Sequence, residues 1–254
     1  MSNLELWNSF GRTDPQYTKA ATVDGNRQTS IASHYMVKLA TESLGPIGVN
    51  WGYSVVDDRF DETAPAMIRK PDQKELVMLT DREGFPIWEL THTLLLEMWH
   101  GSRENTFQQY GHTKYRYMVK KNSYLYVDHE YAKKSLTDAM KKCLSLLGVC
   151  NDIYLGEFDI PSYQELAQVE NDIKKAANRD EEIDKKTSEL KDMIDDRIKA
   201  ISLCPTMEAV GRIYGQMAER INRESPILGL NPEIIKQPLD QAYFEQESKL
   251  KEAK

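Results

Sequence analysis

The sequence has few cysteines, no long apolar run and no leader-like start, and each of these absences excludes a class of protein. Its three cysteines, Cys143, Cys150 and Cys204, are too few for a disulfide framework and form no C-x-x-C pair of a zinc site. No stretch approaches the roughly eighteen apolar residues of a membrane-spanning helix. The opening MSNLELWNSF lacks the basic and apolar regions of a secretory signal. We therefore expect a reduced, cytoplasmic protein without membrane contact.

Motifs for nucleotide or metal chemistry are also missing. There is no G-x-x-x-x-G-K-[ST] loop, so nothing in the sequence indicates ATP use, and the five histidines are too scattered to make a ligand set. Pro71-Asp72 with Lys74 is similar to the start of a restriction-type nuclease core, but neither Glu89 nor Glu97 has a lysine two residues on. We expect no cofactor and no metal ion, and a metal-dependent nuclease stays open as a less favoured function.

Charge is unevenly distributed along the chain. The 254 residues carry 33 basic and 40 acidic side chains, a formal charge of −7, which taken alone argues against nucleic-acid binding. Residues 1–156 have a net charge of only −1, whereas residues 157–254 have −6. Within 110–142, eight basic side chains face three acidic ones. The acidity is therefore mostly C-terminal, and the first part contains a local basic region.

The first part of the sequence predicts an α+β fold, an antiparallel β-meander packed on helices. Residues 1–27 are mixed and polar and predict a partly irregular arm. An acidic stretch with two prolines, residues 57–72, predicts a loop, and Asn122-Ser123 predicts a hairpin turn. Apolar periodicity predicts helices at 28–44 and 130–147 and strands at 49–56, 76–80, 87–99, 110–119 and 124–127.

The C-terminal part differs from the first part in composition and residue spacing, and it predicts a mostly helical region. Residues 164–201 are charged, lack glycine and proline and carry apolar residues near a heptad spacing, which predicts one long helix. Pro205 ends this segment, a second helix is expected over 207–223, and the last twenty or so residues are weakly helical. A helical hairpin and an intermolecular coiled coil are both open. We expect two domains, 1–160 and 161–254.

The helix over residues 130–148 carries the most informative pattern. At 100° per residue the lysines are predicted on one arc, opposite an apolar arc that consists of Ala132, Leu136, Ala139, Met140, Cys143, Leu146 and Leu147. Such a row of ammonium groups suits a polyanion such as a phosphate backbone, although a solvated face that only aids solubility has the same pattern. The lysines of this row are Lys133, Lys134, Lys141 and Lys142.

The strand before this helix alternates basic and aromatic side chains in the sequence KYRYMVKK. Cations can hold phosphates while aromatic rings stack on unpaired bases, which suits a single strand. Tyrosines in such a strand also suit a core, and the same two interpretations apply to Trp51. Strand alternation places Lys114, Arg116 and Lys120 on one face and Tyr115, Tyr117, Val119 and Lys121 on the other.

Three groups of residues form a recognisable combination: His34…Leu39-Ala40-x-Glu42-x-x-Gly45, then Gly48-x-x-Trp51-Gly52, then Lys133-Lys134-x-x-Thr137-Asp138-x-x-Lys141-Lys142-x-Leu144-x-x-Leu147-Gly148. Together they resemble the single-strand annealing proteins of the Rad-fifty-two-like superfamily. The opening, Leu6-Trp7 with Asp14-Pro15 and Lys19, and the stretch Asp152-Ile153-Tyr154-Leu155-Gly156 with Phe158-Asp159 are more similar to the phage, Sak-type branch. The similarity covers roughly residues 5–160, and its specific part is the Thr-Asp-x-x-Lys-Lys helix after a strand meander in combination with the Gly-x-x-Trp element upstream.

The resemblance implies a β-meander on a helix, protomers joined into a ring or helical filament, and a basic groove for single-stranded DNA. Lys141 and Lys142 match the family's basic pair, and Lys133 matches an earlier basic position. Lys19 and Arg27 are candidate second contacts. The candidate DNA-binding residues are thus Lys19, Arg27, Lys114, Arg116, Lys120, Lys121, Lys133, Lys134, Lys141 and Lys142, and the candidate stacking residues are Tyr115, Tyr117 and Trp51.

The expected function is ATP-independent binding and annealing of complementary single strands in DNA recombination and repair, without covalent catalysis. A passive single-strand binder and a helical scaffold are two further hypotheses that the sequence leaves open. Single-stranded DNA, the annealed duplex and further copies of the chain are the expected partners. The acidic C-terminal region is expected to dock an exonuclease or a host single-strand binding protein, or to regulate assembly.

Overall fold

The computed structural model describes residues 4–23, 25–69, 75–119 and 124–252. The chain divides into two compact units, one made of residues 1–11 and 19–154 and the other of residues 12–18 and 155–254. The expected boundary after residue 160 thus lies a few residues from the observed one, and a short N-terminal segment belongs to the second unit. The predicted α+β class is confirmed, with helices, an antiparallel sheet and a helical C-terminal region.

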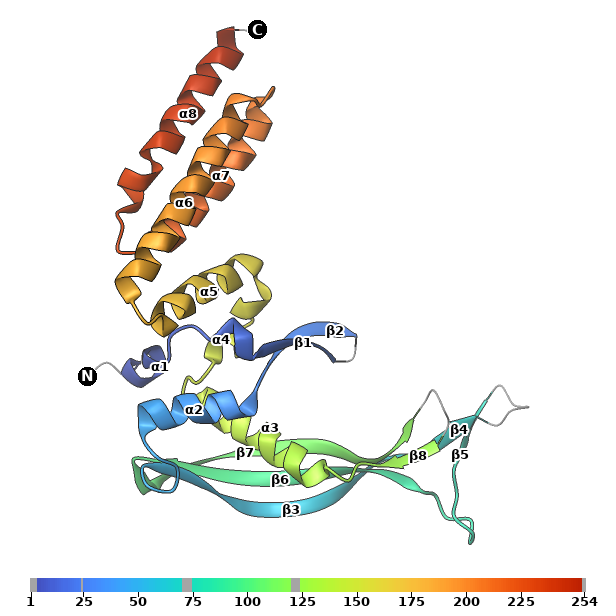
Figure 1. Ribbon diagram of the computed structural model, residues 1–254. Coiled ribbons are helices and arrows are strands. Elements are labelled where there is room, and N and C mark those ends of the chain that lie inside the picture. Colours follow the sequence, from blue (N-terminus) through green and yellow to red (C-terminus); the bar gives the residue numbers. More distant parts are fainter. Residues whose placement is uncertain (1–3, 24, 70–74, 120–123, 253–254) are drawn as a thin grey trace. The chain divides into compact units, whose positions relative to one another are not determined.

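The first unit contains the main sheet, two small ribbons and several helices, of which α3 lies on the sheet (Figure 1). Its helices are α1 (Glu5–Ser9), α2 (Ser33–Leu44), α3 (Tyr131–Leu146) and α4 (Asn151–Tyr154). Its strands are β1 (Thr18–Val23), β2 (Asn26–Ile31), β3 (Trp51–Pro65), β4 (Met67–Arg69), β5 (Leu76–Met78), β6 (Trp88–His100), β7 (Ser102–Val119) and β8 (Tyr124–Val127).

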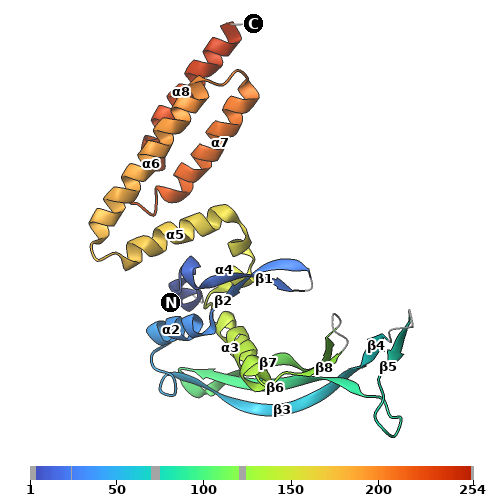
Figure 2. The ribbon, with the colours of Figure 1, turned by 45° about the vertical axis from the view of Figure 1, so that its right-hand side comes forward.

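The main sheet is an antiparallel meander in the order β3-β6-β7-β8. Strand β6 is central, and alternate residues of it, including Leu94, Leu96 and Met98, are buried on one face. Helix α3 packs on this face against β6 and β7, and α2 packs against α3 (Figures 1 and 2). The strands at 76–78, 88–100 and 124–127 and the helix at 131–146 confirm the corresponding sequence predictions.

Both long sides of the sheet are edges in the described residues. Strand β3 pairs only with β6, and β8 pairs with β7 only from Arg116 to Val119, so β7 has a free edge before residue 116. Unpaired edges of this length expose backbone donors and acceptors that other groups must cover. Two small antiparallel ribbons, β1-β2 and β4-β5, complete the strands.

Two predictions for the first unit are wrong. The acidic stretch after residue 57 continues β3 to Pro65 instead of forming a loop, because Arg59 forms ion pairs with Asp57 and Asp61 and so compensates their charges. The helix expected from residue 28 begins at Ser33, since the preceding residues pair with β1 as β2. The predicted turn at Asn122-Ser123 lies outside the described residues.

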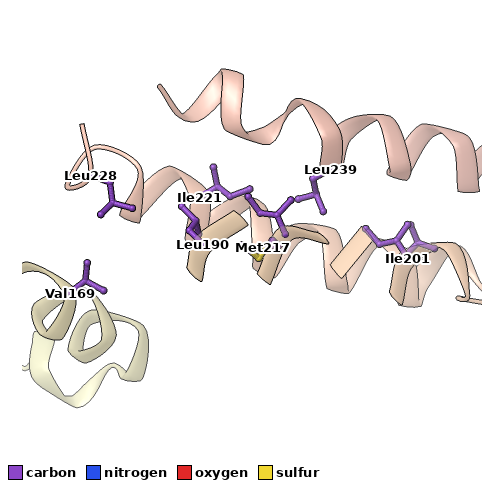
Figure 3. Packing of buried hydrophobic residues seen from close by; sticks show 9 residues of the cluster. Val169, Leu190, Ile201, Met217, Ile221, Leu228 and Leu239 are labelled. Carbon is purple, nitrogen blue, oxygen red and sulfur yellow. The ribbon is translucent and has the colours of Figure 1, made fainter. Parts of the chain in front are cut away.

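The second unit is helical and has its own apolar core. Its helices are α5 (Pro161–Lys175), α6 (Arg179–Ser202), α7 (Met207–Glu224) and α8 (Pro232–Glu252), with one-turn 3₁₀ segments at Pro15–Tyr17 and Glu157–Asp159. Figure 3 shows buried side chains of α6, α7 and α8 directed toward one another, among them Leu190, Met217 and Leu239. The single helix predicted over 164–201 is wrong: it is broken at 176–178, where Asn178 caps α6 through its side-chain oxygen.

Candidate nucleic-acid interface

Helix α3 is held unusually close to β7 by small residues. An added Cβ at Gly111 of β7 would overlap the backbone oxygen of Ser135 and come within 2.7 Å of the backbone nitrogen of Ala139. Ser135 and Ala139 are themselves fully buried, together with Cys143. A glycine facing small helix residues thus lets the two backbones approach, and this packing fixes which face of α3 is turned to solvent.

The four lysines of α3, which we call the lysine ridge, differ in exposure: Lys133 and Lys134 are exposed, as predicted, whereas Lys141 and Lys142 are only partly exposed. Lys133 is highly exposed, and its Nζ lies 3.3 Å from the Oε1 of Glu130. The Nζ of Lys134 lies 2.6 Å from the Oδ2 of buried Asp128. This hydrogen bond raises the pKa of Lys134 and lowers the pKa of Asp128. One end of the ridge is therefore already partly neutralised by carboxylates of the same unit.

The other end of the ridge is formed by the predicted basic pair. Lys141 is half-buried, and the loss of solvent lowers its pKa. Among the described residues no carboxylate lies within ion-pair distance of its ammonium group. The Nζ of Lys142 lies 2.7 Å from the Oδ2 of Asp138, one helical turn away. The pair thus contains one desolvated cation without a direct partner and one with a partner of its own helix.

Asp138 and Lys142 also fasten α3 to the free edge of β7. Asp138 accepts a hydrogen bond from the backbone N–H of His112 at 3.1 Å. Lys142 donates to the backbone oxygen of Tyr110 at 3.0 Å. Each side chain therefore satisfies a backbone group that the edge would leave unpaired. The Thr-Asp-x-x-Lys-Lys motif has a structural role here in addition to the charge that it presents.

Lys114 and Arg116 of β7 do not share a face, so that prediction is wrong. The register shifts by one residue between them, with Lys114 opposite Thr91 and Arg116 opposite Leu90. Consecutive residues of β6 point to opposite faces, and the β-bulge at Tyr115 therefore separates the two side chains. Lys114 is exposed on the face away from α3, and Arg116 is half-buried and donates to the backbone oxygen of Trp88 at 3.0 and 3.1 Å.

The predicted stacking residues have different surroundings. Trp51 is fully buried and donates its Nε1–H to the backbone oxygen of Gly45 at 2.8 Å, so it is wrong as a stacking residue in this conformation. Tyr117 is half-buried and lies against Tyr126. Tyr115 is half-buried in a group of rings that includes Phe60. Both tyrosines are thus partly packed, which fits the core interpretation of the alternating strand.

The remaining candidates are less informative. Lys19 is exposed on β1. Lys120, Lys121 and the side chain of Arg27 lie outside the part of the chain that the structure describes. Sequence reasoning missed Phe60, which is 44% exposed on β3, because it lies in the acidic stretch that predicts a loop. Strand alternation continued through Asp58, Phe60 and Glu62 would have placed it on one face with its neighbours.

Several negative findings complete the description of the site. Within the described ranges, no group of three histidine, cysteine, aspartate or glutamate side chains is placed to hold a metal ion. No helix in the same ranges is both long enough and apolar enough to cross a bilayer. No family model matches the sequence, and no curated protein matches it.

Proposed function

We propose that the chain binds single-stranded DNA and anneals complementary strands without nucleotide hydrolysis, as the resemblance to the Rad-fifty-two-like annealing proteins implies. The lysine ridge carries this proposal: Lys134 and Lys141 project in nearly the same direction from a helix packed on an antiparallel meander, with Lys133 and Lys142 on either side of them. This is the combination of helix motif and meander on which the resemblance depends.

The chemistry of the ridge suits a phosphate backbone. A phosphate that approaches Lys134 replaces Asp128 as its anionic partner, and a phosphate that approaches Lys142 replaces Asp138. Each of these two lysines thus exchanges one carboxylate for one phosphate. Lys141 gains most, because a charge that has lost solvent is stabilised by an anion that supplies the missing partner. Contacts of this kind hold the backbone and ignore sequence.

Annealing follows from backbone binding of this kind. Neutralised phosphates lower the repulsion between two strands, and Watson–Crick pairing supplies both the specificity and the driving free energy. The free edge of β3 supports assembly of several copies side by side, because an unpaired edge strand can pair with another chain. Several copies on one strand would bind with higher avidity than one.

The test is a double substitution, Lys141→Ala with Lys142→Ala, measured by binding and annealing of labelled oligonucleotides without ATP. With about four phosphates contacted per protomer, the logarithm of affinity should fall with log salt at a slope of about −3, and the variant should lose about 1.4 of that slope. Lys185→Ala with Lys199→Ala, two exposed lysines of α6, is the matched control and should leave the slope unchanged. An unchanged slope in the α3 variant contradicts the proposal, and binding without faster annealing favours a passive binder.

A further inference from the structure

Four aromatic rings meet at the end of α3 where the helix begins. Phe60, His92, Tyr115 and Tyr131 come from β3, β6, β7 and α3, one ring from each element. The ring of Phe60 lies 4.5 Å from Tyr115, 5.2 Å from His92 and 5.3 Å from Tyr131, measured between ring centroids. Tyr131 also contacts Tyr115 and His92, at 4.8 and 4.7 Å. We call this group the four-ring cluster.

Phe60 contacts three rings of the cluster and is still partly exposed. Phe60 stands directly opposite His92 in the sheet, and His92 is fully buried with its Nε2 2.7 Å from the Oδ1 of Asp58. The ring contacts of Tyr115 with Phe60 and Tyr131 place it on the same side. Yet 44% of Phe60 is exposed, because β3 is an edge strand. A ring held by three neighbours loses little conformational entropy when a further ring stacks on it.

The charges around the cluster are arranged with opposite signs on its two sides. Tyr131 and Lys134 are three residues apart on α3 and lie on one side of the helix. Asp128, which binds Lys134, also donates its backbone N–H to the oxygen of Tyr115 at 2.8 Å, so the cation lies beside the cluster. On β3, Asp58 and Glu62 flank Phe60 on the same face and are both exposed. On the helix side a phosphate can replace Asp128 as the partner of Lys134, whereas on the β3 side it meets only the carboxylates of Asp58 and Glu62.

We propose that Phe60, through the exposed part of its ring, is a stacking platform for an unpaired nucleobase of a strand whose backbone follows the lysine ridge. The inference depends on the proposed function and adds an orientation to it, with phosphates toward α3 and bases toward β3. Every base has a π-face, so such a platform accepts any sequence, and the carboxylates of Asp58 and Glu62 disfavour the reverse orientation.

The experiment compares wild type, Phe60→Ala and Phe60→Trp on two oligonucleotides of equal length, one intact and one built from abasic sites. Both carry the same phosphates, and only the first has bases to stack. Phe60→Ala should weaken binding of the intact strand about five- to a hundredfold and leave binding of the abasic strand unchanged. Its salt slope should equal that of wild type, since the ring carries no charge. Phe60→Trp should retain affinity, and its added fluorescence should change on binding the intact strand only.

Val55→Ala is the matched control, because Val55 is 48% exposed on the same strand and its loss removes apolar surface without a ring. It should leave binding of both oligonucleotides unchanged. Equal weakening of both strands by Phe60→Ala, or no weakening of either while wild type binds with the expected salt dependence, overturns the platform and leaves the proposed function intact. Absence of salt-dependent binding by wild type overturns both.

Discussion

The contact between Gly111 and α3 allows a quantitative test of how the lysine ridge is held. In Gly111→Ala, the new methyl group overlaps the carbonyl oxygen of Ser135 and lies 2.9 Å from the Cβ of Ala139. A side chain could rotate away from such a clash, but the backbone of a packed helix cannot. The substitution therefore has to push α3 off β7, which also stretches the bonds of Asp138 and Lys142 to the strand edge.

The expected cost follows from overpacking. Inserted methyl groups in packed cores destabilise by about 1–3 kcal/mol, and a backbone clash belongs at the upper end of that range. Replacing glycine by alanine also lowers the conformational entropy of the unfolded chain, which adds about 0.4–1 kcal/mol to the stability of the folded state. The net loss is then about 2 kcal/mol, and at about 2–4 °C per kcal/mol the melting temperature of the first unit should fall by roughly 4–8 °C.

Tryptophan fluorescence is the appropriate assay, because all four tryptophans, Trp7, Trp51, Trp88 and Trp99, belong to the first unit. Gly211→Ala is the control: a Cβ there meets nothing within 4 Å, and α7 belongs to the second unit. It should leave the fluorescence midpoint in place. A Gly111→Ala midpoint within about 1 °C of wild type would refute the close-packing argument.

Two further substitutions test charges. Asp138→Asn keeps an oxygen that accepts from the N–H of His112 but removes the carboxylate that pairs with Lys142. The affinity for DNA, measured by fluorescence anisotropy, should therefore rise about two- to fivefold, which corresponds to the free energy of a surface ion pair. Weaker binding by the variant would contradict this expectation. Burial raises the pKa of Glu224, so the folded chain disfavours its charged form and loses stability from this group as pH rises above the unfolded value near 4.5. Glu224→Gln should therefore gain stability relative to wild type between pH 4 and pH 7 in urea unfolding followed by circular dichroism, and the opposite trend would show that the ion pair with Arg220 dominates.

The elements that the sequence predicts well are those in which local pattern and tertiary context agree. Helix α3 has no breaker and a clear apolar arc, and β6 has a long alternating run, so both are recognisable. The sequence does not predict strand β3 after residue 57, because a run of acidic residues is typical of a loop. The ion pairs of Arg59 with Asp57 and Asp61, which make the strand possible, become visible only in the structure. Asn178 is a typical helix-capping residue and could have indicated the break before α6. The heptad-like spacing of apolar residues on either side of it instead favours one continuous helix.

The candidate site is predictable in composition and less so in arrangement. The shared direction of Lys134 and Lys141 follows from helical geometry alone, whereas the partial burial of Lys141 depends on tertiary packing. The separation of Lys114 from Arg116 depends on one bulge, which no local pattern announces. The partner of Lys134 comes from before the helix, at Asp128, whereas the partner of Lys142 lies at the i,i+4 spacing that sequence can reveal.

The unequal lengths of helix and sheet have a consequence for how the first unit moves. Sixteen residues of α3 extend about 24 Å, whereas eighteen residues of β7 extend about 60 Å. Figure 1 accordingly shows the sheet continuing past α3 toward β4, β5 and β8. Amide protons of β6 under the helix, from His92 to Trp99, should exchange only with global opening, while those near Trp88 exchange through local fraying. Strand β6 is thus expected to be rigid under α3 and to open locally at the end near Trp88.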